Sequence, residues 1–161
     1  MPDTAVEPAP LVEVRLLGLP VAVYQRAAEH GDELTREFQL LLERHTLPSE
    51  STPARLLALA AELQAGYGAL TESQEQELAA AVERADATVD ISYHVPPGVA
   101  EAVRRLRSLL EEADRYCQAE KLLTLTTPPE TVAFREWFLL EFVRQLDGGR
   151  PRPWPGHAPG E

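Results

Sequence analysis

The residues that come closest to a catalytic arrangement lie at alternate positions of one short segment. Asp90, Ser92 and His94 are separated by apolar residues within 88–95. Side chains two residues apart in a strand lie on the same face, so an acid, a hydroxyl and an imidazole would share one surface. The same pattern is ordinary for the solvent face of a half-buried strand. We therefore predict that the chain is not an enzyme, and keep an enzyme using His94 with Asp90 or Ser92 as an alternative.

Other reactive side chains do not combine into a site. Acids surround His30 in the run Glu29 to Glu33, but neighbouring residues of a helix point in different directions around its axis. The single cysteine, Cys117, lies on an apolar helical stripe, which is typical of a buried structural thiol. The sequence has no glycine-rich phosphate-binding motif. We predict no catalytic residue, no metal site and no cofactor.

The charge balance bears on the kind of partner. The chain has 26 acidic and 15 basic residues, a formal net charge of −11. Nucleic acids and anionic membranes both attract basic proteins, so neither is expected as a partner. No apolar run is long enough for a membrane span, and no signal peptide is evident at the N-terminus. These features predict a cytoplasmic protein.

Proline and glycine divide the chain into three parts. Residues 1–10 are rich in proline and predict a flexible N-terminal arm. Residues 11–147 have the apolar content and periodicity of a single globular domain. Residues 148–161 are rich in proline and glycine, and predict a disordered tail.

Two segments of the body alternate between apolar and polar residues, as half-buried strands do. They are 11–17, which Gly18 to Pro20 should end, and 88–95. Because an isolated strand leaves its backbone groups unpaired, we expect the two to pair in an antiparallel sheet. The segment 120–126 is either a third strand or an extended linker.

Helical periodicity predicts about five helices around this sheet, an α+β fold that is mostly helical. The segments are 21–44, one from Thr52 to the glycines at 66 and 68, one beginning at a capping box over 71–74, 99–117, and 129–146. Gly31 inside the first helix indicates a kink or a close helix contact. Thr127 is positioned to cap the last helix, and Gly148 to end it.

Aromatic residues are the candidates for a binding surface. Apolar groups cover more than one stripe of the helix 129–146, which is typical of a helix at the centre of a bundle or of one with an interface face. Trp154 in the tail has no obvious core to join. The candidate partner-binding residues are Phe134, Trp137, Phe138, Phe142, Tyr24, Phe38 and Trp154. A homodimer through one of these faces is a further expectation.

Three stretches carry a resemblance to other proteins. They are VRLLGLPVAVYQRAAEHGDELTREFQLL (14–41), EEADRYCQAEKLLTLTTPPE (111–130) and VAFREWFLLEFVRQL (132–146). Together they resemble small uncharacterised actinobacterial proteins associated with partner-switching signalling genes. Those genes encode kinase-like anti-sigma factors, STAS proteins and serine phosphatases. The chain has no asparagine for the ATPase boxes of the kinase. The resemblance implies an accessory role, with an anti-sigma kinase, a STAS protein or a serine phosphatase as partner.

The leading hypothesis is a non-catalytic regulatory or adaptor protein of a bacterial signalling system, acting by protein–protein contact. The alternative is a small-molecule sensor with an apolar pocket between its helices, near Tyr67, Tyr93 and Trp137. The fold distinguishes these hypotheses. A deep pocket favours the sensor, whereas a large exposed apolar patch without a pocket favours the adaptor.

Overall fold

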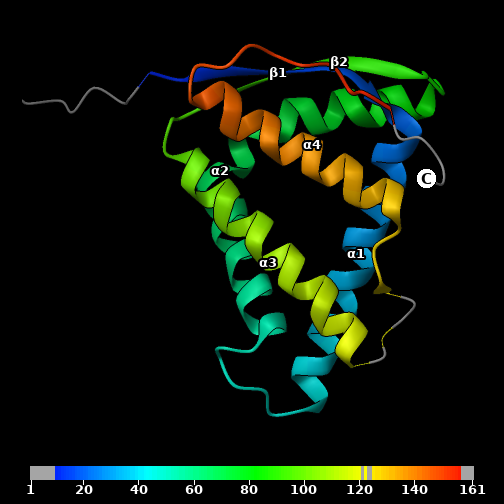
Figure 1. The fold of residues 1–161 in the computed structure, drawn as a ribbon, viewed down its shortest axis with the longest axis vertical. Helices are drawn as coiled ribbons and strands as arrows, with labels where there is room; N and C mark the ends of the chain where they lie inside the picture. Colours follow the sequence, from blue (N-terminus) through cyan, green and yellow to red (C-terminus); the bar gives the residue numbers. More distant parts are fainter. Residues whose placement is uncertain (1–9, 121, 123–124, 157–161) are drawn as a thin grey trace, which may run out of the picture.

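The two predicted strands do pair, and the helices extend away from one face of the sheet (Figure 1). The computed structural model describes residues 10–120, 122 and 125–156. The elements in chain order are β1 (Val12–Pro20), α1 (Val21–Arg44), α2 (Thr52–Glu83), β2 (Thr88–Val95), α3 (Val99–Ala119) and α4 (Pro129–Leu146). The α+β fold class is therefore confirmed, with four helices in the described part of the chain where about five were expected.

A bulge carries β1 beyond the point where its predicted alternation ends. The antiparallel register runs from Val12 opposite Val95 to Leu16 opposite Ile91, and resumes at Leu19 opposite Val89. One extra residue on β1 thus lies opposite β2, which defines a β-bulge. Because of it, Leu16 and Leu19 face the same side and are both fully buried.

Gly18 makes this bulge possible. Its φ is +62°, in the left-handed region that glycine occupies without steric penalty. Its backbone N–H donates to the Asp90 carboxylate at 2.7 Å. The prediction that the strand ends at residue 17 was wrong, because an alternating pattern does not reveal an inserted residue.

On each outer edge of the two-stranded sheet, a glutamine side chain bonds to the backbone of one residue. On the β1 edge, Gln145 of α4 donates to the Arg15 carbonyl and accepts from the Arg15 N–H, each at 2.8 Å. On the β2 edge, Gln74 of α2 donates to the Ser92 carbonyl at 2.8 Å. An unpaired strand edge is otherwise open to water or to another strand. These contacts also fix where α2 and α4 cross the sheet.

The helix α2 is continuous where the sequence predicted two helices. Gly66 and Gly68 lie within it, and the Thr71 hydroxyl donates to the Gly68 carbonyl at 3.2 Å. Thr71 and Gln74 therefore do not form the predicted capping box. Tertiary contacts outweigh the low helix propensity of the two glycines. The second half of α2 turns to run along the sheet (Figure 1).

Two apolar clusters make up the core. The larger lies under the sheet, between β1, β2, α4 and the second half of α2. The smaller joins α1, α2 and α3 at the far end and contains Cys117, which is fully buried as predicted. Burial raises the pKa of the Cys117 thiol to about 11. This thiol is therefore protonated at neutral pH and is a poor nucleophile.

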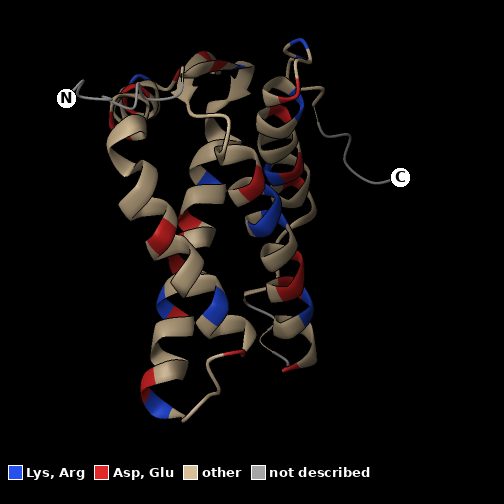
Figure 2. Ribbon diagram, turned by 90° about the vertical axis from the view of Figure 1, so that its left-hand side faces the viewer, with Lys and Arg blue, Asp and Glu red and all other residues tan. Residues whose placement is uncertain are grey.

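Charged residues of both signs are intermixed on the outer faces of the helices (Figure 2). Ion pairs join neighbouring helices, including Arg55–Glu112 at 2.7 Å between α2 and α3 and Arg107–Glu136 at 2.8 Å between α3 and α4. Within the described ranges, none of the helices has the length and apolarity that a bilayer span requires.

The alternative third strand over 120–126 falls mostly outside the described residues, since 121, 123 and 124 are not described. Leu122 and Leu125, which are described, are joined by a turn in which the Leu125 N–H donates to the Leu122 carbonyl at 3.0 Å. The predicted arm, 1–10, also lies outside the described residues except for Pro10.

The tail folds back onto α4 and β1 over residues 148–156. Gly148 has φ +95° and ends α4 as predicted, with its N–H donating to the Gln145 carbonyl at 3.0 Å. Farther along, the Trp137 indole donates to the Arg152 carbonyl at 3.1 Å. The Trp154 N–H donates to the carbonyl of Leu17 in the bulge at 3.0 Å. The structure thus differs from the expected disorder over this stretch, because backbone hydrogen bonds and an indole dock it on the body.

A buried carboxylate anchors the tail. Glu141 of α4 is 3% exposed and accepts hydrogen bonds from the Gln145 amide at 2.8 Å and the Arg152 N–H at 3.0 Å. Arg144 pairs with its other oxygen. A buried charge is tolerated only when it is paired and hydrogen-bonded, as it is here. Glu141 therefore links the tail to the glutamine that caps the β1 edge.

We predict opposite effects for the same substitution at two glycines. Gly18→Ala should lower the free energy of unfolding by about 1–2 kcal/mol, because alanine is strained at a positive φ. Gly66→Ala, in an open position of α2, should raise it by about 0.5–1 kcal/mol through helix propensity. Urea denaturation measures both changes, and equal effects of the two variants would contradict the bulge.

We predict that Glu141→Ala lowers the free energy of unfolding by about 2–4 kcal/mol, because it leaves buried donors without an acceptor. Glu62→Ala, at an exposed ion pair with Arg105, should change it by less than about 0.5 kcal/mol. Thermal denaturation followed by circular dichroism measures both. A loss at Glu141 no larger than at Glu62 would show that the tail network contributes nothing.

Candidate functional site

The aromatic residues expected to bind a partner lie largely inside the protein. Phe38, Phe134, Trp137 and Phe142 are buried, while Tyr24, Phe138 and Trp154 are half-buried. All but Phe38 gather in the core under the sheet and the tail. Phe38 lies in the other cluster, with its ring centroid 5.7 Å from that of Tyr116. The helix 129–146 is therefore a central helix of the core.

The polar face of β2 does not assemble a triad. Asp90 accepts from Gly18, and the Ser92 hydroxyl donates to Glu13 at 3.4 Å. The His94 ring is more than half exposed and lies 3.9 Å from Glu13. Asp90 thus binds the backbone of the bulge while Ser92 and His94 both lie near Glu13, and no hydrogen bond joins the three side chains in the described part of the chain.

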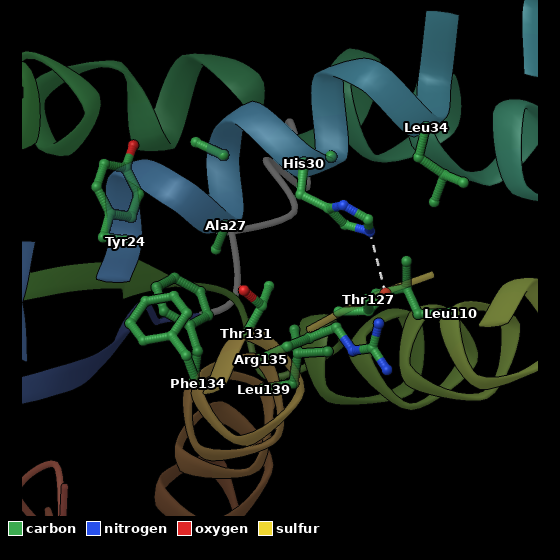
Figure 3. A pocket seen from close by; sticks show the side chains of 13 residues that line it. Tyr24, Ala27, His30, Leu34, Leu110, Thr127, Thr131, Phe134, Arg135 and Leu139 are labelled. Carbon is green, nitrogen blue, oxygen red and sulfur yellow. Dashed lines mark hydrogen bonds between the residues drawn. The ribbon is translucent and has the colours of Figure 1, made fainter. Parts of the chain in front are cut away.

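A pocket lies between α1, α3 and α4, with a volume of about 250 Å³ (Figure 3). Its walls are mostly apolar, and Phe134, Phe138 and Leu139 line it from the larger core cluster under the sheet. Leu34 and Leu110 line it from the smaller cluster. An apolar hollow with a few polar groups is the usual form of a small-molecule site.

Small residues on α1 create the space. Ala27 and Gly31 lie between Tyr24 and Leu34 on the side of α1 that lines the pocket. A methyl group built on Gly31 would meet no atom within 4 Å. The close helix contact that was one of the two expectations for Gly31 is therefore not made, and the kink stays a prediction. The side chains at these positions are too short to reach α4, and a pocket remains.

A hydrogen-bonded relay closes one end of the pocket. His30 Nε2 lies 3.1 Å from the Thr127 hydroxyl, which donates to one oxygen of Asp114. Arg135 donates to the other oxygen of Asp114 at 2.8 Å. The relay joins α1, α3 and α4 through residues that are distant in the sequence.

Sequence reasoning missed this relay. It placed Thr127 as the cap of the last helix, but α4 begins after Pro128 and has no side-chain cap, and the Thr127 hydroxyl turns to Asp114. It grouped His30 with acids of its own helix, whereas its hydrogen-bond partner comes from the segment before α4. Histidine, threonine and aspartate are common, and nothing in the sequence indicates that three of them so far apart will meet.

The relay fixes the state of His30. Burial lowers the pKa of His30 and Arg135 adds to this, although Asp114 and Glu33 oppose the shift. The ring is therefore neutral at neutral pH. Because Thr127 gives its only proton to Asp114, its oxygen must accept from His30, so the neutral ring carries its proton on Nε2.

The residues named for a sensor pocket do not share one cavity. Tyr67 lines a second hollow of about 280 Å³ between α2, α3 and the end of β2. Tyr93 is buried under the sheet, and Trp137 is buried beneath the tail. A pocket between helices does exist, but Tyr24, Phe134 and Phe138 are its aromatic residues.

The chain matches no known protein-family model, no curated protein and no solved structure. The association with partner-switching proteins therefore stays a prediction. The described residues also contain no group of three or more side chains placed to hold a metal ion. The pocket between α1, α3 and α4 is the feature whose geometry bears most directly on function.

We predict that His30 reduces stability as the pH falls. Its pKa in the folded chain lies below the ordinary value of 6.5, so the unfolded chain binds this proton more tightly. Between about pH 7.5 and pH 5.5, His30→Gln should therefore lose less free energy of unfolding than the natural chain. Urea denaturation at both pH values gives the comparison, with His94→Gln as the control. Equal losses in the natural chain and His30→Gln would contradict a half-buried, neutral His30.

Proposed function

We propose that this protein is a non-catalytic sensor domain that binds a small apolar molecule in the pocket between α1, α3 and α4. The observation that carries the proposal is the pocket itself, which is walled by leucine and phenylalanine side chains and opens to the surface. Buried apolar surface is the main source of affinity for such ligands.

The size of the pocket limits the ligand. A closed apolar cavity of about 150 Å³ takes up benzene. At about 250 Å³, this pocket has room for one ring with a short substituent. Phe134 and Phe138 in the lining supply aromatic surface against which a ring can pack.

The position of the pocket supports a regulatory role. Phe134 lines the pocket and also lies against Trp154 of the tail, with ring centroids 6.0 Å apart. Trp137 in turn lies 5.5 Å from Trp154. A ligand that shifts Phe134 would therefore press on the docked tail. Such a change could be recognised by a signalling partner of the kinds that the resemblance implies.

The other proposal for this chain is an adaptor that acts by protein–protein contact, but the described residues expose little apolar surface for a partner. Leu11 is the one large apolar side chain that is exposed in the described ranges. An extended apolar patch, which the adaptor hypothesis would favour, is therefore not displayed there. The half-buried rings of Tyr24 and Phe138 at the pocket remain the aromatic groups nearest to a partner.

We predict that ethylbenzene binds in this pocket with a dissociation constant between roughly 10 µM and 10 mM, as expected for eight heavy atoms. Methyl NMR titration should show saturable shifts at Leu34, Leu110 and Leu139. Ala27→Leu should abolish them by filling the pocket, whereas Ala61→Leu on the exposed face of α2 should not. If the shifts do not saturate, or survive Ala27→Leu, the proposed function is refuted.

A further inference from the structure

We infer that the ligand of this pocket carries one uncharged oxygen acceptor, such as a ketone or ester carbonyl, which the hydroxyl of Thr131 binds. This inference rests on the proposed function and names the chemical class of its ligand. Four observations at the relay end of the pocket support it.

The first is an unused hydroxyl group. Thr131 lies in the first turn of α4, is 7% exposed and lines the pocket. Its oxygen points toward the cavity (Figure 3). No hydrogen bond joins this hydroxyl to another group in the described part of the chain. The residue is largely enclosed, but its oxygen can still be reached from the cavity, so a ligand atom that accepts from this hydroxyl in place of water would gain affinity.

The second is the nature of the neighbouring groups, which favours an acceptor. The buried Nε of Arg135, on the same side of α4, is a donor that has no hydrogen-bond partner among the described residues. The first turn of α4 has no side-chain cap, and the positive end of the helix dipole lies there. Both oxygens of Asp114 are already used, since one accepts from Thr127 and the other from Arg135.

The third is the balance of charge. Among the described residues that line the pocket, Arg135 is the one permanent cation, and Asp114 neutralises it at 2.8 Å. His30 is neutral, for the reasons given above. A carboxylate would therefore lose its hydration without meeting a free cation, and an ammonium group would meet the guanidinium. An uncharged oxygen avoids both costs.

The fourth is the short polar segment of the wall. The rest of the lining is glycine, alanine, leucine and phenylalanine together with Tyr24, whose hydroxyl points away from Phe134 (Figure 3). The Thr131 hydroxyl at one end of such a surface suits a molecule that is polar at one end only. A sugar, a nucleotide or an amino acid would leave several polar groups facing hydrocarbon, each at a cost in free energy.

The test uses three one-ring probes of similar size on the full chain: ethylbenzene, acetophenone and benzoate. Each is titrated by methyl NMR into the natural protein and into Thr131→Val, which removes the hydroxyl and keeps the shape. Thr71→Val on α2 is the matched control. Circular dichroism verifies that each variant is folded.

We expect Thr131→Val to weaken the binding of acetophenone by about 2- to 12-fold, the usual contribution of one hydrogen bond. The same variant should leave the affinity for ethylbenzene unchanged, and Thr71→Val should leave both affinities unchanged. Benzoate should bind the natural protein most weakly of the three probes. The comparison is the ratio of the dissociation constants of one probe for the two proteins. The greater water solubility of acetophenone affects both constants equally, so it does not change this ratio.

Two results would overturn the inference while leaving the proposed function in place. One is equal binding of acetophenone to the natural protein and Thr131→Val, with ethylbenzene still saturating the pocket. The other is tightest binding of benzoate, which would indicate an anionic ligand. If none of the three probes shifts the lining residues, the proposed function fails together with the inference.

Discussion

The outer edges of the β1–β2 pair impose a constraint that the surrounding helices must meet. Two strands bond to one another on one side only, and each leaves a row of backbone groups on the other. Gln145 bonds to the backbone of Arg15 on one edge and Gln74 to the Ser92 carbonyl on the other, each at 2.8 Å. Because these glutamines belong to α4 and α2, the sheet determines where both helices lie. Glu141 then extends the network from Gln145 to the tail.

The pocket follows from this arrangement. With α4 held to the sheet by Gln145, its inner face presents Phe134 and Phe138 to α1. Between Tyr24 and Leu34 the facing stretch of α1 has small residues at Ala27, Ala28 and Gly31, so the helices do not fill the space between them. The relay from His30 to Arg135 bridges the open end with hydrogen bonds in place of apolar packing. The resulting cavity is apolar along its length and polar at one end.

Much of the fold could be predicted from local patterns. Alternation identified both strands and their antiparallel pairing, and helical periodicity identified α1, α3 and α4. The apolar stripe also predicted the burial of Cys117. These features depend on residues that are close in sequence, where spacing carries the information.

Features that depend on distant residues were not predictable. The bulge at Gly18 is stabilised by Asp90, and the relay joins His30 to Asp114 through Thr127. The tail has the composition of a disordered segment, but its docking is determined by donors and acceptors on α4 and β1 that its own sequence does not reveal. The continuity of α2 through its glycines likewise results from packing against the sheet. The candidate site was missed for the same reason.

The docking of the tail has an optical consequence. The chain has two tryptophans, Trp137 and Trp154, and their rings lie 5.5 Å apart where the tail crosses α4. One indole belongs to the body and the other to the tail, and only docking brings them together. The tryptophan fluorescence of the protein, excited selectively at the red edge of the absorption band, therefore originates at this one junction. Its emission wavelength and intensity report whether the tail is seated, without any attached dye.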